Sequence, residues 1–147
     1  MKYKTLSVLL LVSALTVSGC GKAATSAPSA QPLAVEDKAS FIASLQASNA
    51  TAEIGDTVIQ DFFTPEGNII KVNRLDVQVF EYETAEVMEA EASQVAPDGG
   101  SVGTSMMMWV DTPHFYKAGR IIVLYLGSDQ AILDLLEQVL GPQFAGQ

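Results

Sequence analysis

The segment IIVLYLGSDQAILDLLEQVLGP, residues 121–142, places an uninterrupted apolar run directly before a helical pattern. The six residues IIVLYL predict an apolar strand, Asp129 is a typical N-cap residue, and Gly141-Pro142 ends a helix. The apolar face of that helix is formed by Ile132, Leu133, Leu136, Val139 and Leu140. A strand followed by a capped amphipathic helix is therefore expected here.

Several further apolar runs, separated by turn residues, predict an antiparallel sheet that includes this strand. Strands of a meander are expected over residues 52–54, 58–64, 69–72 and 75–82, with tight turns at Pro65-Glu66-Gly67 and Asn73-Arg74. Strands are also expected over residues 104–111 and 114–117, on either side of a turn at Pro113.

Two more helices are expected upstream of the final one. Asp37 can cap a helix over residues 37–48, and Thr84 can cap another that ends near residue 95. The predicted fold class is therefore α+β, a single antiparallel sheet with helices packed mainly on one face. Residues 73–88 and 118–133 each run from a turn through a strand to a capped helix, with Phe80 and Tyr125 at matching positions, which is consistent with a duplicated strands-then-helix unit.

The first 20 residues have the composition of an export signal. Lys2 and Lys4 precede an apolar core that is too short to span a bilayer. The sequence LTVSGC at residues 15–20 resembles the lipobox of bacterial lipoproteins, in which the cysteine becomes the lipidated first residue of the mature chain. We expect a cleaved signal peptide over residues 1–19 and lipidation at Cys20, including palmitate; an ordinary secretory signal with an incidental cysteine is the alternative.

The expected mature chain consists of a tether and one domain. Residues 20–32 are rich in alanine, serine, threonine and proline, which predicts a disordered tether after the lipidated cysteine. Such a tether reaches at most about 40 Å and on average nearer 20 Å. Residues 33–147 then form a single α+β domain. The predicted location is extracytoplasmic, on the outer leaflet of the cell membrane or on an outer membrane.

The charge of the chain excludes some partners. The whole sequence has a formal net charge of −9, and removal of Lys2 and Lys4 leaves six basic residues against 17 acidic ones, a net charge of −11. Such a surface repels phosphate backbones and anionic headgroups, so nucleic-acid binding is not expected. Membrane attachment should depend on acyl chains rather than on a basic patch.

No set of catalytic residues is evident. His114 is the only histidine, and no G-x-S-x-G sequence surrounds Ser101 or Ser105, so we expect no enzymatic activity and no cofactor. A series of glutamates lacks the spacing of a calcium loop and is interpreted as a solvated helix face. These are Glu81, Glu83, Glu86, Glu89 and Glu91.

Two clusters are candidate binding residues. Met106 and Met108 would share one face of a strand and, with His114, offer the soft ligands that Cu(I) prefers, although core packing is the favoured interpretation of these methionines. A groove between sheet and helices could be lined by aromatic side chains, which would otherwise belong to the core. The aromatic candidates are Trp109, Phe115, Tyr116 and Tyr125.

Three stretches resemble a group of short bacterial lipoproteins and secreted proteins with no known function. They read VNRLDVQVFEY, WVDTPHFYKAGRIIVLYLG and LLEQVLGPQFAG, and the resemblance covers roughly residues 41–146. Members more often carry glycine where Arg74 stands, which would suit a type I′ turn better. The resemblance implies a domain boundary but no activity, cofactor or site residue.

The leading functional hypothesis is a lipid-anchored extracytoplasmic interaction or envelope-accessory domain without catalytic activity, whose partner is another envelope protein. The alternative is a binding module of the cell envelope for a small molecule or peptide. A Cu(I)-binding Met/His protein is a more remote alternative.

Overall fold

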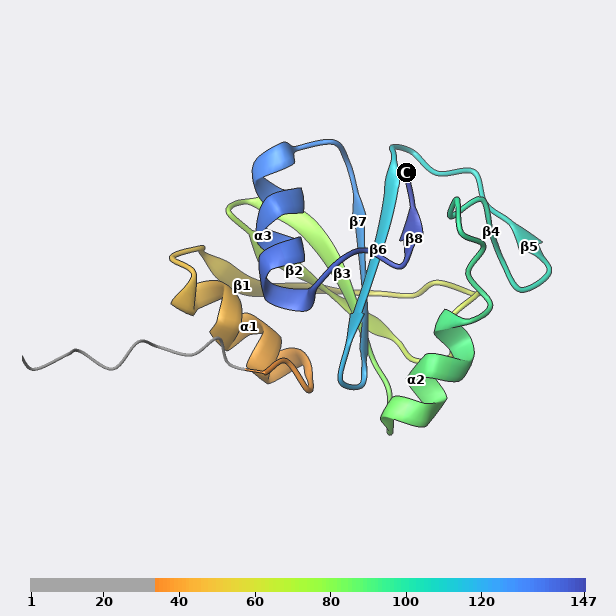
Figure 1. Ribbon diagram of the computed structural model, residues 1–147, viewed down its shortest axis with the longest axis horizontal. Coiled ribbons are helices and arrows are strands. Elements are labelled where there is room, and N and C mark those ends of the chain that lie inside the picture. Colours follow the sequence, from red (N-terminus) through yellow and green to blue (C-terminus); the bar gives the residue numbers. More distant parts are fainter. Residues whose placement is uncertain (1–33) are drawn as a thin grey trace, which may run out of the picture.

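The computed structural model describes residues 34–147, which form a mixed α+β domain (Figure 1). In chain order the elements are α1 (Lys38–Ala47), β1 (Ala52–Val58), β2 (Gly67–Val72), β3 (Leu75–Glu81), α2 (Ala85–Ala92), β4 (Ser101–Val102), β5 (Ser105–Met106), β6 (Pro113–Ala118), β7 (Ile121–Leu126), α3 (Gln130–Leu140) and β8 (Ala145–Gly146). The expected signal peptide, the lipidation site at Cys20 and the expected tether lie outside the described residues.

One antiparallel sheet organises the domain. Its strand order is β1-β2-β3-β7-β6-β8, and every neighbouring pair is antiparallel, while β4 and β5 form a separate small pair. The apolar strand β7 lies between β3 and β6, and its residues 121–125 are all buried. The prediction of an α+β fold with one main antiparallel sheet is confirmed.

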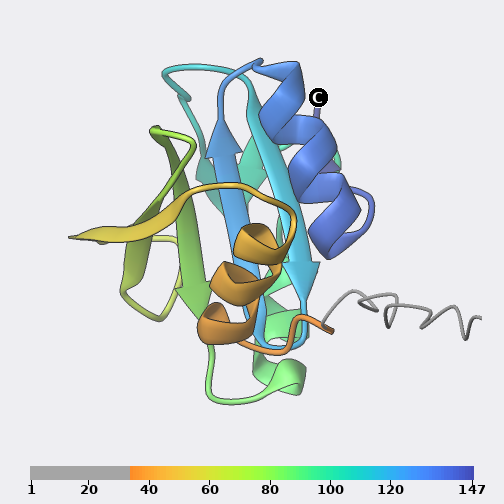
Figure 2. The same cartoon turned by 90° about the vertical axis from the view of Figure 1, so that its left-hand side faces the viewer.

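The helices divide between the two faces of the sheet (Figures 1 and 2). Ile121, Val123 and Tyr125 of β7 belong to a first core cluster with α1 and α3, whereas Ile122 and Leu124 belong to a second cluster with α2. Because alternate residues of a strand point to opposite faces, the two clusters lie on opposite sides of the sheet. The expected arrangement on one face holds for α1 and α3, and α2 covers the other face.

The three predicted N-caps are confirmed. The side chains of Asp37, Thr84 and Asp129 accept hydrogen bonds from backbone N–H groups three residues later, at 2.8, 3.3 and 3.1 Å. Each bond satisfies one of the N–H groups that the first turn of a helix leaves without an intrahelical partner.

Residues 58–64 do not form the expected strand. Strand β1 ends at Val58, and the chain then turns, with the Phe63 N–H donating to Gln60 O at 3.0 Å. Phe62 and Phe63 both pack against the second core cluster. Successive side chains of a strand would point to opposite faces, so this packing requires an irregular backbone. The aromatic composition explains why a strand was predicted.

The expected strand over residues 104–111 is also wrong for most of its length. Only Ser105–Met106 pairs, with Ser101–Val102, and no strand follows until Pro113. Pro113 is not in a turn but is the first residue of β6, where a residue without an N–H is tolerated.

The two strand-then-helix units match less closely than expected. Phe80 belongs to the second core cluster and Tyr125 to the first, so the two residues face opposite sides of the sheet and their predicted equivalence is wrong. The order of turn, strand and capped helix is shared, but α2 and α3 pack on opposite faces.

The turn between β2 and β3 gives a first prediction. Val72 pairs with Leu75, and both residues between them have positive φ, 48° at Asn73 and 76° at Arg74, as in a type I′ turn. Glycine adopts positive φ without the steric cost that arginine bears. We therefore expect Arg74→Gly to raise the free energy of unfolding by roughly 1 kcal/mol, measured by urea denaturation.

Asn73→Gly is the matched control for that substitution. The Asn73 side-chain oxygen accepts from the Thr51 N–H at 2.9 Å, a bond that glycine would remove. This variant should be no more stable than the parent chain. A destabilised Arg74→Gly would contradict the proposed origin of the strain.

Candidate functional site

Three apolar side chains project into solvent from one extended segment, and we call Met106, Met108 and Val110 the apolar ridge. Their exposed fractions are 85%, 98% and 92%, the largest among the exposed large hydrophobic residues of the described chain. Met107 and Trp109, which alternate with them, pack inward against the second core cluster. The segment thus has the side-chain alternation of a strand although most of it has no pairing partner.

The base of the apolar ridge is firmly held. Trp109 donates its indole N–H to Gly99 O at 2.7 Å, and the Met107 N–H donates to Gly100 O at 3.0 Å. The indole ring packs edge-on against Phe62 and Phe115, with centroid distances of 5.6 and 5.8 Å. Because alternate residues are anchored, the ridge residues cannot turn inward without loss of these contacts.

The apolar ridge lies at the opposite end of β6 from the point where the described chain begins. Pro113, at one end of β6, closely follows the ridge, while the β6–β7 turn at Gly119 and Arg120 contacts Glu36. Six residues of strand separate these ends by about 17 Å. In Figure 1 the segment with β4 and β5 and the start of α1 are accordingly far apart.

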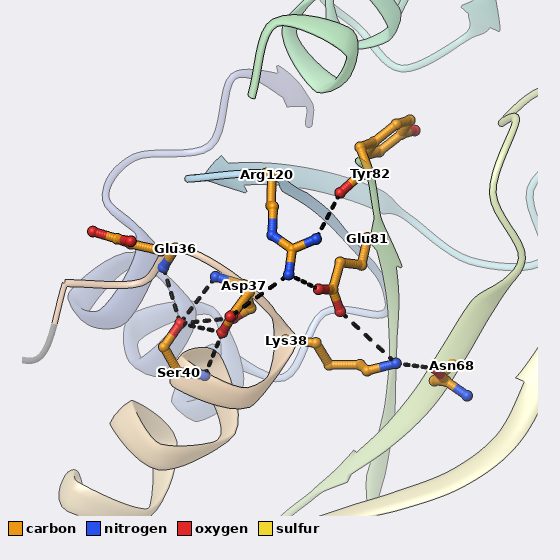
Figure 3. Close-up of polar contacts among 8 residues, drawn as sticks. All are labelled: Glu36, Asp37, Lys38, Ser40, Asn68, Glu81, Tyr82 and Arg120. Atoms are coloured by element: carbon orange, nitrogen blue, oxygen red, sulfur yellow. Dashed lines mark hydrogen bonds and ion pairs between the residues drawn. The ribbon is translucent and has the colours of Figure 1, made fainter. Parts of the chain in front are cut away.

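A polar cluster fastens the start of the described chain to the sheet (Figure 3). The Arg120 guanidinium donates to Tyr82 O at 3.0 Å and pairs with Glu81 at 2.5 Å and, more loosely, with Asp37 at 3.7 Å. The Arg120 N–H donates to Glu36 O at 2.9 Å. Lys38 extends the cluster to Asn68 of β2. These contacts join α1, β2, β3 and the β6–β7 turn, so the domain has a fixed orientation relative to its first residues.

Asp37 is the residue of this cluster that we expect to respond to acid. The hydrogen bond from the Ser40 N–H, that from the Ser40 hydroxyl, and the charge of Arg120 hold the pKa of Asp37 below its usual value near 3.8. A carboxyl group with a lowered pKa in the folded state stabilises the fold above its unfolded-state pKa, and this contribution is lost as the pH falls through the folded-state pKa. We expect Asp37→Asn to lose less stability than the parent as the pH falls from 5 to 2.

Denaturant unfolding at these two pH values would measure the effect. Asp61→Asn, a change at an exposed side chain of the loop after β1, is the control and should keep the acid sensitivity of the parent chain. An unchanged acid response in Asp37→Asn would contradict the role given to its carboxylate.

The aromatic candidates do not line one groove. Trp109 and Phe115 pack in or against the second core cluster, whereas Tyr116 and Tyr125 belong to the first, on the other face of the sheet. Phe115, Tyr116 and Tyr125 are buried. Phe115, Tyr116 and Tyr125 are core residues and Trp109 packs against the core, as the alternative interpretation of these aromatic side chains expects.

The Met/His candidates are also apart. Met106 and Met108 do share one face, as predicted, but that face is solvent. His114 is buried and faces the side of α3, with Nδ1 at 2.8 Å from Gln143 Oε1. Within residues 34–147 no group of three or more histidine, cysteine or acidic side chains could hold a metal ion. The geometry therefore gives Cu(I) binding no support.

The glutamates are less uniformly solvated than expected. Glu81 pairs with Arg120, Glu89 pairs with Lys117, and Glu91 accepts from the Tyr82 hydroxyl at 2.9 Å. The solvated-face interpretation is therefore wrong for Glu81 and Glu91, which are half-buried, but it describes Glu89, whose side chain is 59% exposed. The contacts of these three glutamates connect α2 and β3 to residues distant in the chain, so they could not be predicted from local sequence.

Sequence reasoning missed the apolar ridge as a unit. It recognised that Met106 and Met108 share a face, but assigned the methionines to packing and did not include Val110. The signal is the alternation in SMMMWV, which shows two faces but does not say which is buried. The buried face proves to be that of Met107 and Trp109.

Comparison with protein families, curated proteins and solved structures finds no match to this chain. Among residues 34–147, no helix has the length and apolar character needed to cross a membrane.

Proposed function

We propose that this protein is a lipid-anchored extracytoplasmic interaction domain without catalytic activity, and that the apolar ridge is its contact surface. The observation that supports this proposal is that the three ridge side chains are exposed to solvent while Met107 and Trp109, which alternate with them, are fixed by hydrogen bonds and packing. Burial of each such side chain on a partner would contribute roughly 1.5–3 kcal/mol before the costs of association.

The position of the apolar ridge supports a partner away from the anchoring membrane. The proposed anchor at Cys20 precedes the described chain, which enters the domain beside Glu36. The ridge is at the far end of β6 from that entry. The expected flexible tether over residues 20–32 would leave a domain anchored through Cys20 free to turn this far end, and with it the ridge, toward a partner beyond the membrane surface.

The charge of the domain favours a basic protein partner. Residues 34–147 contain five basic and 17 acidic side chains, a net charge of −12. This charge opposes approach to anionic headgroups and favours a surface with lysine or arginine around an apolar groove. We propose an envelope protein with such a groove.

Site-directed photo-crosslinking in intact cells tests the proposal. A crosslinking residue at position 108 should give one discrete adduct, whereas one at Ile54, which is also apolar and exposed but lies on β1, should give none. With the captured protein purified, serine at all three ridge positions should weaken binding roughly a hundredfold. Ile54→Ser with Ile59→Ser is the matched control and should leave affinity unchanged.

The anchor is tested in the same cells. Cys20→Ala should move the chain from the membrane fraction to the soluble fraction, because acyl chains supply the proposed attachment. Equal crosslinking from positions 54 and 108, or binding unaffected by the serine substitutions, would overturn the contact surface. Membrane retention of Cys20→Ala would overturn the anchor alone.

A further inference from the structure

His114 carries a buried nitrogen that the fold leaves without a partner. Its exposed fraction is 6%, its ring stacks on Tyr125 with a centroid distance of 6.2 Å, and Nδ1 is 2.8 Å from Gln143 Oε1. Nε2 is buried and makes no hydrogen bond within the described residues. If the Gln143 amide oxygen accepts from Nδ1 and the ring is in its neutral tautomer, Nε2 presents a lone pair.

This arrangement is costly for a purely structural residue. A buried acceptor without a donor costs about 1–3 kcal/mol, which an apolar side chain of similar size would avoid. Most buried polar atoms in folded proteins have a partner. The lone pair on Nε2 is therefore available to a donor from outside the chain, either a water or a ligand.

A pocket is present beside His114. It has a volume of about 260 Å³ and lies between β6, α3 and the C-terminal segment. Its lining consists of His114, Tyr116, Gln130, Leu133, Glu137, Pro142, Gln143 and Gln147. Since one water occupies about 30 Å³ of liquid, the pocket could hold roughly eight waters or one small organic molecule.

The lining favours a positively charged ligand. The lining contains no lysine or arginine, and Glu137 has its one carboxylate side chain. The pKa of Tyr116 is raised first by burial and then by the charges of Glu137 and Asp134, the two carboxylates on the α3 side of this wall. The three glutamine side chains add hydrogen-bonding groups around the same space.

We propose that this pocket binds a small organic ammonium compound, whose N–H groups donate to His114 Nε2 and to the Glu137 carboxylate. A movement of the side chains that cover Nε2 would admit the ligand. The site is independent of the apolar ridge, because His114 faces the α3 side of the sheet and the ridge is anchored in the cluster on the other side.

The single histidine of the chain makes the test direct. With isotopically labelled histidine in the full chain, the nitrogen resonances report only His114. Putrescine should shift the Nε2 resonance in a saturable manner, and butanediol, a neutral molecule of the same length, should not. Glu137→Gln should weaken putrescine binding about tenfold, the change expected when an ion pair becomes a neutral contact.

Glu53→Gln, a change on the exposed side of β1 at the far edge of the sheet, is the matched control and should leave the affinity unchanged. The proposal is overturned if putrescine produces no saturable shift, if butanediol produces the same shift, or if Glu137→Gln binds as tightly as the parent chain. None of these outcomes affects the test of the apolar ridge.

Discussion

Phe115→Ala should lower the free energy of unfolding by about 4 kcal/mol, the largest effect that we expect from one substitution. The Phe115 side chain is fully buried, and its ring contacts those of Trp109, Phe63 and Phe144 at centroid distances of 5.8, 6.5 and 6.1 Å. Its removal would leave a cavity under the apolar ridge that these rings cannot fill without loss of their mutual contacts.

Guanidinium denaturation followed by Trp109 emission would measure this loss, because Trp109 is the only tryptophan and belongs to the same cluster. Phe144→Ala is the matched control. Phe144 is only partly buried at the edge of the cluster, so its truncation should cost roughly 1–2 kcal/mol. Equal losses from the two substitutions would show that Phe115 does not have the central position assigned to it.

Elements with complete local signals could be predicted from the sequence. The strand β7 and the helix α3 each carry an apolar pattern and end signals within one continuous segment, and the N-caps Asp37, Thr84 and Asp129 need only the first turn of their helices. The antiparallel order followed from short connections between apolar runs. These features depend on residues close together in the chain.

Features that depend on distant contacts could not be predicted. The apolar stripe of α2 would suit either face of the sheet, and the choice depends on the aromatic cluster built from residues 62–63, 80 and 115. Residues 59–64 and 107–111 have strand-like composition but no pairing partner in the sheet. Strand propensity describes a half-buried surface and does not supply the partner.

In the candidate site, too, the features set by neighbouring residues could be predicted and those set by distant contacts could not. Alternation in residues 105–110 predicted that Met106 and Met108 share a face, but burial of the opposite face depends on Gly99, Phe62 and Phe115. The His114 pocket is built from β6, α3 and the C-terminal segment. Its carboxylate and amide groups are more than 15 residues from His114 in the chain, so no local motif reveals them.

Gly119→Ala should cost roughly 3 kcal/mol or more, for two reasons that can be separated. Gly119 has φ +52°, and a Cβ atom there would lie 2.3 Å from the Cα and carbonyl oxygen of Glu36. Both contacts are with backbone, so the clash is relieved only if the first described residues move away from the β6–β7 turn. We expect loss of the hydrogen bond from the Arg120 N–H to Glu36 O and of the Asp37 contact with Arg120.

Gly141→Ala isolates the conformational part of this cost. Gly141 has φ +88° and ψ −175°, a conformation that only glycine adopts freely, but a Cβ atom there would meet nothing within 4 Å, so this variant should lose about 1–3 kcal/mol. Amide exchange of Arg120 distinguishes the variants, because only Gly119→Ala should expose that N–H before global unfolding. If both variants lose the same stability and retain Arg120 protection, Glu36 is not fastened to the turn. In that case the position of the chain's entry, at the opposite end of β6 from the apolar ridge, loses its main support.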